Sequence, residues 1–431
     1  MEQVKVGLVG LGTVGSGVAR LLLDHGDRAA RHVGRQVKLE QVVVQNIDRP
    51  RSVKLPPGIL SDDLKRITGN PQIVAVAHLV GGLEPARSIM LELLQSGKDV
   101  VTANKALLAE HGQELFDAAR RAGRSIAFEA AVAGGIPIIA NISQCLSANQ
   151  IRSIHGILNG TCNFILTQMD SSGADYAAAL AEAQRRGYAE ADPSLDVDGT
   201  DTAHKLAILT QLAFGVRPPW RDIPRVGIDR LDAADLRYAK ELGYRIKLLA
   251  VAELGDAGLE IHVSPTLVHR STPLAEVHGA FNAINLVGDA VGPLFFHGLG
   301  AGQMPTASAV VADLIDTIVG RAAITFRTLQ LWSDREPQFT LADHAQSSGR
   351  YYLRFNVADR PGVLADIAGE LGRHGISIAS VIQHTQDGVD GTVPLVIMTH
   401  KARDGAMSEA FGVIERLEHV RPPSSRMRVY G

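Results

Sequence analysis

Close to its start, the chain places three glycines between an apolar strand pattern and a helical pattern. The run VKVGLVG (4–10) leads into GLGTVG, so Gly10, Gly12 and Gly15 have the spacing G-x-G-x-x-G. Glycines at such a junction allow a tight turn and let backbone amides approach a pyrophosphate at the N-terminus of the helix. A glycine-rich turn without a ligand has the same composition, but a strand before it and a helix after it are the context that dinucleotide binding requires.

Strand and helix patterns alternate over the first 135 residues. Further apolar strands are expected within 37–47, 72–82, 99–104 and 125–132, with helices from about Pro85 to Ser96 and from Lys105 to Gly123. This alternation predicts an α/β fold with a Rossmann-type, doubly wound parallel sheet. We assign the first domain to residues 1–135 and expect the helical run at about 305–330 to join it.

The pattern changes after Gly134. Helical periodicity at 174–187 and 199–214, followed by four closely spaced strand candidates between 244 and 298, predicts an α+β domain over 136–304. Periodicity is lost at 333–350, which we interpret as a linker. Residues 351–431 then follow the order β-α-β-β-α-β of a ferredoxin-like domain.

Charge, hydropathy and cysteine content exclude several kinds of protein. A net charge of −3 over 431 residues gives no reason to expect a nucleic-acid partner. The longest apolar runs are too short for a transmembrane helix, and the first residues lack a basic leader, so we expect a cytoplasmic protein without a membrane partner. Two cysteines, Cys145 and Cys162, make neither a disulfide framework nor a zinc site.

The residues after the second strand bear on the choice of dinucleotide. A dinucleotide-binding fold often carries an acid there to hold a ribose hydroxyl, and Asp48 comes slightly late for that role. Arg49 and Arg51 flank it and would suit the 2′-phosphate of NADP. The same charges also suit a solvated loop, so NADP is favoured only slightly over NAD.

Hydride transfer to a carbonyl also needs a proton donor, and two lysines are candidates. Lys105 follows VTAN at the carboxyl end of a predicted parallel strand, where ligands of such sheets bind. Lys205 lies four residues after Asp201 in DVDGTDTAHKLAIL, where the carboxylate would orient it. An ordinary surface ion pair on a helix, or a surface lysine at a helix start, gives the same pattern.

Two further carboxylates precede this helix. Glu190 and Asp196 lie in GYAEADPSLDVDG, and either would pair with the ammonium group of an amino-acid substrate. Either would equally serve as a loop or helix cap.

Several segments together resemble one family. GLGTVG, VTANK, EAAVAGGIPII, GILNGTCNFIL, GYAEADPSLDVDGTDTAHKLAIL and GAGQMPTASAVVADLID occur in the order found in homoserine dehydrogenases and cover roughly residues 1–330. The segment DRPGVLADIAGELGRHGISIASVIQ resembles an ACT domain, the amino-acid-sensing module at the C-terminus of many bacterial members.

The resemblance implies reversible reduction of L-aspartate 4-semialdehyde to L-homoserine with NADH or NADPH, in threonine and methionine synthesis. It also implies that the α+β domain at 136–304 binds the substrate and serves catalysis and dimerisation. Lys205 matches the proton donor, Asp201 its catalytic partner and Lys105 a lysine near nicotinamide and substrate. Glu190 and Asp196 match substrate-contacting carboxylates, and Thr13, Val14 and Gly302 match cofactor contacts. A monovalent cation, usually sodium, is implied on main-chain oxygens of Glu129, Val132, Gly134 and Ile136.

The chain departs from the family pattern at a few positions. His78 and Leu79 stand where a polar residue is common, Cys162 replaces a usual Thr, and Phe164 replaces a usual Tyr. These changes concern the shape of the pocket and spare the residues expected to move the proton.

The C-terminal domain is expected to bind an effector. Its DRPGVL segment, with Asp359, Pro361, Gly362 and Val363, sets a turn before a helix whose first amides are free for a carboxylate. The family makes L-threonine the expected effector, and ACT pairing makes the protein a homodimer or homotetramer. A domain used only for dimer contact is the alternative.

Two other functions remain as alternatives. One is another dehydrogenase with an ACT domain, such as a 2-hydroxy-acid enzyme, which would carry its glycine motif well inside the chain instead of at Gly10. The other is a non-catalytic amino-acid sensor, against which the presence of Lys105, Asp201 and Lys205 argues.

Overall fold

The computed structural model describes residues 2–384 and 391–431, and the chain divides into two compact units. Unit 1 comprises Met1–Ile151, His204–Asp222 and Val287–Gln338. Unit 2 comprises Arg152–Ala203, Ile223–Leu286 and Phe339–Gly431. Each unit therefore combines segments that are distant in the sequence.

Unit 1 is built on a six-stranded parallel sheet with the order β3-β2-β1-β4-β5-β6. Its strands are β1 (Gln3–Val9), β2 (Gln36–Val43), β3 (Leu60–Ser61), β4 (Ile73–His78), β5 (Asp99–Thr102) and β6 (Ile126–Ala127). The central strands β1 and β4 pair in parallel from Lys5↔Ile73 to Val9↔His78. The strand order on both sides of β1 is that of a doubly wound sheet, so the prediction for this part of the fold is confirmed.

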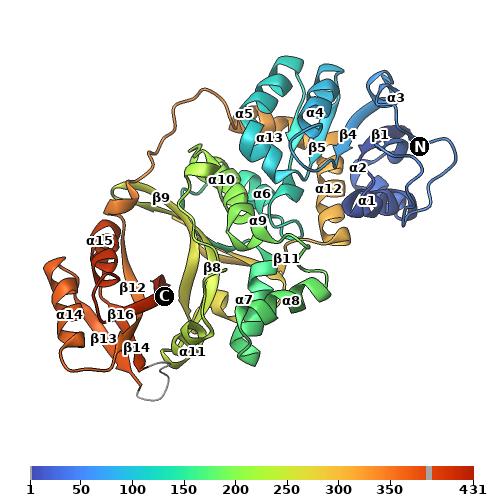
Figure 1. Ribbon diagram of the computed structural model, residues 1–431. Coiled ribbons are helices and arrows are strands. Elements are labelled where there is room, and N and C mark those ends of the chain that lie inside the picture. Colours follow the sequence, from blue (N-terminus) through green and yellow to red (C-terminus); the bar gives the residue numbers. More distant parts are fainter. Residues whose placement is uncertain (1, 385–390) are drawn as a thin grey trace. The chain divides into compact units, whose positions relative to one another are not determined.

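Helices cover both faces of this sheet. They are α1 (Thr13–Asp24), α2 (Gly26–Val33), α3 (Lys65–Thr68), α4 (Ala86–Gln95), α5 (Lys105–Ala122), α12 (Gln303–Ile318) and α13 (Arg321–Leu329). Figure 1 shows α4 and α5 together on one side of the central strands, and α1 and α12 on the other. The helix expected to return to the first domain thus packs against α1, where a Cβ on Gly17 would lie 2.9 Å from the Cβ of Ala307.

Two local features of unit 1 differ from the sequence expectation. The short β3 was not predicted, because two residues carry no detectable periodicity. The strand expected at 125–132 ends at Ala127 and continues as a 3₁₀ turn, η1 (Glu129–Ala131). A short helix, α6 (Ile138–Ala140), and a π turn, η2 (Asn141–Cys145), follow along the chain.

Unit 2 contains a mixed sheet in which neighbouring strands follow the order β10-β7-β8-β9-β16-β12-β14-β13. The first four are β7 (Ile151–Ile157), β8 (Tyr244–Gly255), β9 (Gly258–His269) and β10 (Phe281–Gly288), and β11 (Gly292–Leu299) follows β10 along the chain. The helices are α7 (Gly160–Ser172), α8 (Tyr176–Arg185), α9 (Ser194–Val197), α10 (Thr200–Phe214) and α11 (Ala233–Glu241). Helix α10 is continuous, and it passes from the residues of unit 2 into those of unit 1.

The C-terminal residues form the predicted ferredoxin-like domain. It consists of β12 (Ser348–Ala358), α14 (Val363–Arg373), β13 (Ile378–Gln383), β14 (Thr392–Thr399), β15 (Ala402–Arg403), α15 (Asp404–Ile414) and β16 (Val420–Tyr430). Side chains alternate along β12: Tyr351, Leu353 and Phe355 join a core with α14 and α15, which lie together in Figure 1. Tyr352 and Arg354 point to the other face, toward Asp235 of α11.

The ferredoxin-like sheet continues the sheet of the catalytic region. Strand β16 pairs in parallel with β9, from Arg428↔Thr266 to Tyr430↔Val268. Leu341, within the segment interpreted as a linker, forms a bridge with Leu259, and a 3₁₀ turn, η5 (His344–Gln346), leads into β12. These contacts leave β9 with a hydrogen-bonded partner on each side.

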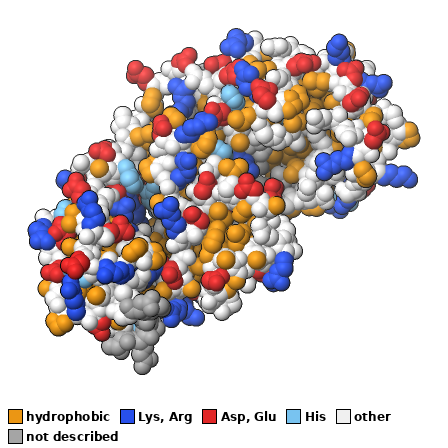
Figure 2. Space-filling model, viewed as in Figure 1, with side chains coloured by type: hydrophobic (Ala, Val, Ile, Leu, Met, Phe, Trp, Pro, Cys, Tyr) orange, Lys and Arg blue, Asp and Glu red, His pale blue; other side chains and the backbone are white. Residues whose placement is uncertain are grey.

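Charge is distributed evenly on the visible surface. Figure 2 shows Lys and Arg side chains interspersed with Asp and Glu side chains over the viewed face. Any electrostatic preference on this face therefore comes from local clusters. Among the described residues, no helix combines the length and apolar character needed to cross a membrane.

Candidate active site

The glycine loop has the geometry that its spacing predicts. Gly10 has a φ of +94°, and a Cβ there would lie 2.6 Å from the Leu79 carbonyl oxygen. A Cβ on Gly15 would lie 2.1 Å from the Gly10 oxygen, so any side chain would break the turn. A Cβ on Gly12 would meet nothing within 4 Å, and Gly12 caps α1 without a side-chain hydrogen bond. The start of α1 therefore has open space beside it and no side-chain cap, as a pyrophosphate site requires.

A cavity of about 770 Å³ adjoins this loop, within unit 1. Gly10, Gly12 and Thr13 line it, together with Asn46 and Arg49 from the segment after β2. Its size and its position at the carboxyl ends of the parallel strands fit a dinucleotide. Val14 is directed away from the cavity, into the core behind α1.

The two arginines after β2 have different surroundings. Arg51 donates to the carbonyl oxygens of Asn46, Ile47 and Arg49, so its guanidinium holds the loop together. Both arginines line the cavity, but the Arg49 side chain makes no hydrogen bond or ion pair with the part of the chain that is described. Asp48 does not line the cavity; its backbone amide donates to Asn46 Oδ1 at 2.9 Å.

The start of α12 meets the same loop. Gly302 caps α12 with a φ of +124°, a conformation that favours glycine. The next residue, Gln303, lines the cavity and donates from Nε2 to the Thr13 carbonyl oxygen at 3.0 Å. Gly302 is thus placed beside the glycine loop, although 289 residues separate it from Thr13 in the sequence.

Lys105 begins α5 directly after β5. Its neighbour Asn104 caps the helix, accepting from the Leu107 amide at 3.0 Å. The side-chain Nδ2 of Asn104 also donates to the carbonyl oxygens of Val80 and Gly82, at 3.0 and 2.7 Å, in the segment after β4. These bonds tie Lys105 to the carboxyl edge of the sheet, beside the cavity wall formed by Val80 and Gly81.

A single buried asparagine holds two of the predicted acids together. Asn159 Nδ2 donates to Asp196 Oδ1 at 2.7 Å and to Asp201 Oδ2 at 2.9 Å. Its Oδ1 accepts from the Cys162 amide at 2.8 Å, which caps α7 and fixes the orientation of the side-chain amide. The sequence reasoning missed Asn159 as a site residue, although an Asn before a helical run is an N-cap signal.

Lys205 and Asp201 lie on the same helix, α10, one turn apart. Both are nearly buried, with 9% and 8% of their surface exposed. A surface ion pair, the ordinary alternative for this spacing, does not describe side chains with so little exposure. Glu190 lies on the loop between α8 and α9 with an exposed side chain, and its carbonyl oxygen accepts from Gln184 Nε2 at 3.1 Å.

The two departures on α7 have local consequences. Cys162 donates from Sγ to the Asp196 carbonyl oxygen at 3.2 Å, as a threonine hydroxyl would. The ring of Phe164 packs against that of Tyr188 with centroids 4.8 Å apart. Cys162 therefore still supports the backbone that carries Asp196.

The four residues expected to bind a monovalent cation lie in one tight loop of unit 1. Ala133 has a φ of +49°, and the Ile136 amide donates to its carbonyl oxygen at 2.6 Å. The carbonyl oxygens of the buried residues Val132 and Gly134 accept no hydrogen bond from the described chain. The carbonyl oxygens of Glu129 and Ile136 already accept from the Val132 and Ile138 amides at 3.5 and 2.8 Å. Buried carbonyl oxygens without donors suit a cation, so the fit to the expected group rests on Val132 and Gly134.

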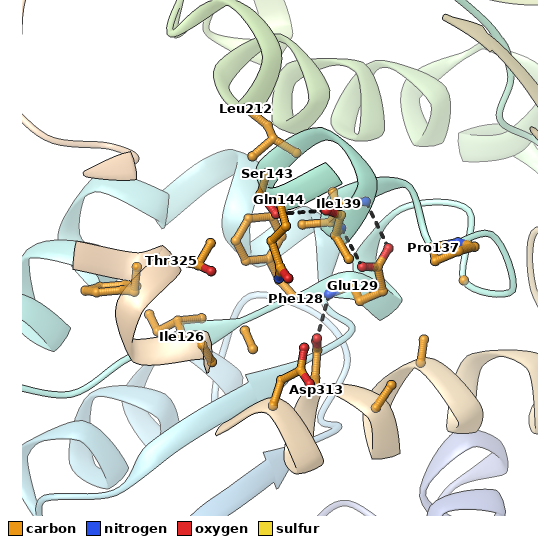
Figure 3. Close-up of a pocket in the computed structure, with 18 of the residues that line it drawn as sticks. Ile126, Phe128, Glu129, Pro137, Ile139, Ser143, Gln144, Leu212, Asp313 and Thr325 are labelled. Carbon is orange, nitrogen blue, oxygen red and sulfur yellow. Dashed lines mark hydrogen bonds between the residues drawn. The ribbon is translucent and has the colours of Figure 1, made fainter. Parts of the chain in front are cut away.

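The Glu129 carboxylate positions this loop (Figure 3). It accepts from the Ile139 and Ala140 amides at 2.9 and 2.7 Å, while the Glu129 amide donates to Asp313 of α12 at 2.8 Å. The pocket around these residues measures about 520 Å³ and is mainly apolar, and burial raises the pKa of Glu129 to about 7. Burial also raises the pKa of Asp313, and the neighbouring Glu129 adds to that rise.

The predicted effector residues surround a cavity of about 360 Å³ in the ferredoxin-like domain. Asp359, Pro361, Gly362 and Val363 line it, with Gln383 of β13 and Leu395 of β14. Gly362 caps α14 with a φ of +95° and no side-chain hydrogen bond. Free amides at the start of an eleven-residue helix thus border the cavity.

Comparison with known proteins agrees with this arrangement. Residues 10–129 match the NAD binding domain of homoserine dehydrogenase, residues 137–315 match the homoserine dehydrogenase family, and residues 351–418 match the ACT domain. The chain is 44% identical to a homoserine dehydrogenase of Synechocystis sp., covering 99% of both chains, and 42% identical to one of Pseudomonas aeruginosa, covering 100% and 99%.

The structure of a homoserine dehydrogenase from Thiobacillus denitrificans superposes with a TM-score of 0.91 at 41% identity, covering 100% of this chain and 99% of that one. With three matching family domains and relatives similar over their full length, the chain belongs to the homoserine dehydrogenase family, NAD(P)-dependent oxidoreductases that act on a CH–OH group.

Proposed function

We propose that this protein catalyses the reversible reduction of L-aspartate 4-semialdehyde to L-homoserine in threonine and methionine synthesis. The observation that carries this proposal is the buried acid pair, Asp196 and Asp201, held by Asn159 one helical turn before Lys205. Carboxylates suit an ammonium group as a partner, and a lysine on the next turn of the same helix suits proton transfer to oxygen.

Lys205 holds the proton that reaches the aldehyde oxygen during reduction, and it removes the proton of the hydroxyl in the reverse direction. Asp201 orients this ammonium group from the preceding turn of α10. Asp196 and Glu190 bind the substrate ammonium. Lys105 contacts the substrate near the nicotinamide ring. When bound, the reduced nicotinamide cofactor would donate the hydride to the aldehyde, and its oxidised form would accept the hydride from the alcohol.

NADPH is the preferred reductant in this proposal. Arg49 and Arg51 both line the dinucleotide cavity, but the Arg51 guanidinium is engaged with backbone oxygens, so support for a 2′-phosphate contact comes from Arg49. Arg49→Ala should raise KM for NADPH at least about tenfold and leave KM for NADH within about twofold, because only NADPH carries the 2′-phosphate. Equal effects on both cofactors would remove Arg49 from cofactor selection.

A monovalent cation, sodium by family resemblance, binds the main-chain oxygens of Glu129, Val132, Gly134 and Ile136. The unpartnered carbonyl oxygens of Val132 and Gly134 support this. Its role is to keep the loop between β6 and α6 in one conformation. Replacing sodium by tetramethylammonium, which cannot enter such a loop, should lower the melting temperature; an unchanged value would contradict the site.

Regulation by L-threonine completes the proposal, and the cavity at Asp359–Val363 supports it. The protein acts in the cytoplasm as a homodimer or homotetramer, the assembly expected of ACT domains. Asp359→Ala should abolish inhibition by threonine and retain basal turnover. Millimolar threonine that neither binds in calorimetry nor lowers activity would rule out this effector.

The decisive experiment is NADPH oxidation followed by absorbance with L-aspartate 4-semialdehyde, with NADH in parallel. Turnover is expected between pH 7 and 9. No absorbance change with either cofactor, in protein that binds NADPH, would instead favour the non-catalytic sensor.

A further inference from the structure

A second polar cavity lies in unit 2 where β16 joins β9. Its volume is about 390 Å³, and we call it the seam cavity. Arg225 and His262 line it from the catalytic region, and Asp404, Arg426 and Arg428 line it from the ferredoxin-like domain. None of these residues belongs to the dinucleotide cavity, the acid pair or the cavity at Asp359–Val363.

Basic side chains outnumber acidic ones in this lining. Arg225, Arg426 and Arg428 are set against the single carboxylate of Asp404. That carboxylate is already occupied: it accepts from the Tyr351 hydroxyl at 2.9 Å and from Arg428 Nη2 at 3.4 Å. Arg428 also donates to Glu260, so Arg428 and Asp404 satisfy their own charges within the wall.

Arg426 retains donors that the protein does not use. Its Nη1 donates to Ser408 Oγ at 2.6 Å, and Nε and Nη2 meet no acceptor among the described residues. His344, from the turn before β12, also lines the cavity. Its Nε2 lies 3.5 Å from Asp404 Oδ2, and its Nδ1 is buried without a partner in the described chain.

The surroundings of His262 show that positive charge dominates near the seam cavity. This side chain is 5% exposed, and its Nδ1 lies 3.1 Å from Ser264 Oγ. Burial lowers its pKa well below the usual value, and the positive charge of Arg428 lowers it further. A neutral His262 leaves the arginines as the dominant charges in the cavity.

We propose that the seam cavity binds a small oxyanion, a carboxylate or phosphate group, through the free donors of Arg426, with Arg225 adding positive charge to the same lining. A planar guanidinium with two unused donors is the usual partner of such groups. The segment of Arg225 is attached to β9, because the amide of the next residue, Val226, donates to the carbonyl oxygen of Val263 on β9 at 2.9 Å. Arg426 and Arg428 lie on β16, the strand that pairs with β9, so the lining comes from both sides of this junction. A bound anion would therefore hold the ferredoxin-like domain onto the catalytic sheet.

The test is isothermal titration calorimetry of the full-length protein with inorganic phosphate and, separately, with acetate at constant ionic strength. Saturating NADPH keeps the dinucleotide cavity filled, so that phosphate does not bind there. One saturable site per chain is expected. Arg426→Gln should weaken binding at least about tenfold, because it removes a charge-assisted pair. Arg421→Gln is the matched control on the same strand, because its guanidinium bonds to the carbonyl oxygens of Glu418 and Val420.

The outcomes separate the sources of the anion and the possible sites. Phosphate binding alone assigns a phosphate-bearing ligand, and acetate binding alone assigns a carboxylate metabolite. No saturable heat from either anion, or unchanged affinity in Arg426→Gln, overturns the proposal. Loss of binding in Arg360→Gln, which alters the cavity at Asp359–Val363, would also overturn it.

If circular dichroism shows that Arg426→Gln does not fold, Arg225→Gln replaces it, and the same tenfold weakening of anion binding is expected. Because the readout is heat of binding, failure here leaves the proposed reaction untouched.

Discussion

The side-chain amide of Asn159 lies 2.9 Å from Asp201 Oδ2, and the same nitrogen lies 2.7 Å from Asp196 Oδ1. Two carboxylates that would repel each other thus share one donor. Because Asn159 Oδ1 is engaged with the Cys162 amide, the amide group cannot rotate without uncapping α7. Asn159 is therefore a positioning residue for the acid pair.

Asn159→Ala should lower kcat/KM about 10- to 100-fold, because the acids lose their common donor and separate. It should also cost about 1 kcal/mol of stability through the lost cap. Asp175→Ala is the matched control: it removes the cap of α8, where Oδ1 accepts from the Ala178 amide at 2.7 Å, and should leave activity unchanged. Equal kinetics in the two variants would show that Asn159 acts only as a cap.

Lys205→Ala should reduce kcat by about 10²–10⁴, the usual effect of losing a positioned acid or base. Lys205→Arg should fail as well, because a guanidinium stays protonated at working pH. Both variants should bind NADPH normally in a fluorescence titration. Lys240→Ala, an exposed lysine on α11, should keep full activity. If Lys205→Ala retains more than about a tenth of kcat, Lys205 does not transfer the proton.

Glu190→Gln should mainly raise KM for homoserine. An ion pair with the substrate ammonium stabilises ground state and transition state alike, so kcat should fall less than kcat/KM. Asp192→Asn, on the same exposed loop, is the control, because its carboxylate bonds to the Ser194 amide. A Glu190→Gln enzyme with normal KM and reduced kcat would assign this carboxylate a different role.

His78 at the end of β4 is fully buried, and burial lowers its pKa to about 4. The unfolded chain binds a proton near pH 6.5 that the folded chain binds only near pH 4, so stability falls as pH decreases through this window. The total loss is about 3 kcal/mol, at 1.36 kcal/mol per pKa unit. His78→Leu should therefore reduce the drop in melting temperature between pH 7 and 5, while exposed His32→Leu should not; identical slopes would contradict this assignment.

Arg354 and Asp235 form a buried pair between β12 and α11. Arg354 Nε lies 2.6 Å from Asp235 Oδ1 and Nη2 lies 3.0 Å from Oδ2, with Tyr352 and Ser425 donating to the same carboxylate. Arg354→Met should destabilise the protein by about 3–5 kcal/mol, because Asp235 remains buried without its cation. Adding Asp235→Leu should recover much of this loss in chemical denaturation.

The control is Arg31→Met, which breaks the exposed pair with Asp27 and should cost about 0–1 kcal/mol. A double variant no more stable than Arg354→Met would mean that packing around Arg354, and not the unpaired charge, sets the cost.

Sequence alone determined the features that depend on neighbouring residues. The glycine loop, the parallel sheet and the ferredoxin-like unit follow from local periodicity and turn chemistry, and the structure confirms that fold class. The spacing of Asp201 and Lys205 likewise places both on one side of α10. Local steric and hydrogen-bonding rules act over a few residues, so these elements are visible in the chain itself.

Only the tertiary structure decided which distant groups meet. Asn159 reaches Asp196 and Asp201 across 37 and 42 residues, and the pair Arg354–Asp235 spans 119. The sequence pattern does not indicate that β16 pairs with the edge of β9, and this pairing creates the seam cavity. Strand edges are chemically alike, and the partner of a buried charge depends on how whole elements pack, so these contacts exist only once the chain has folded.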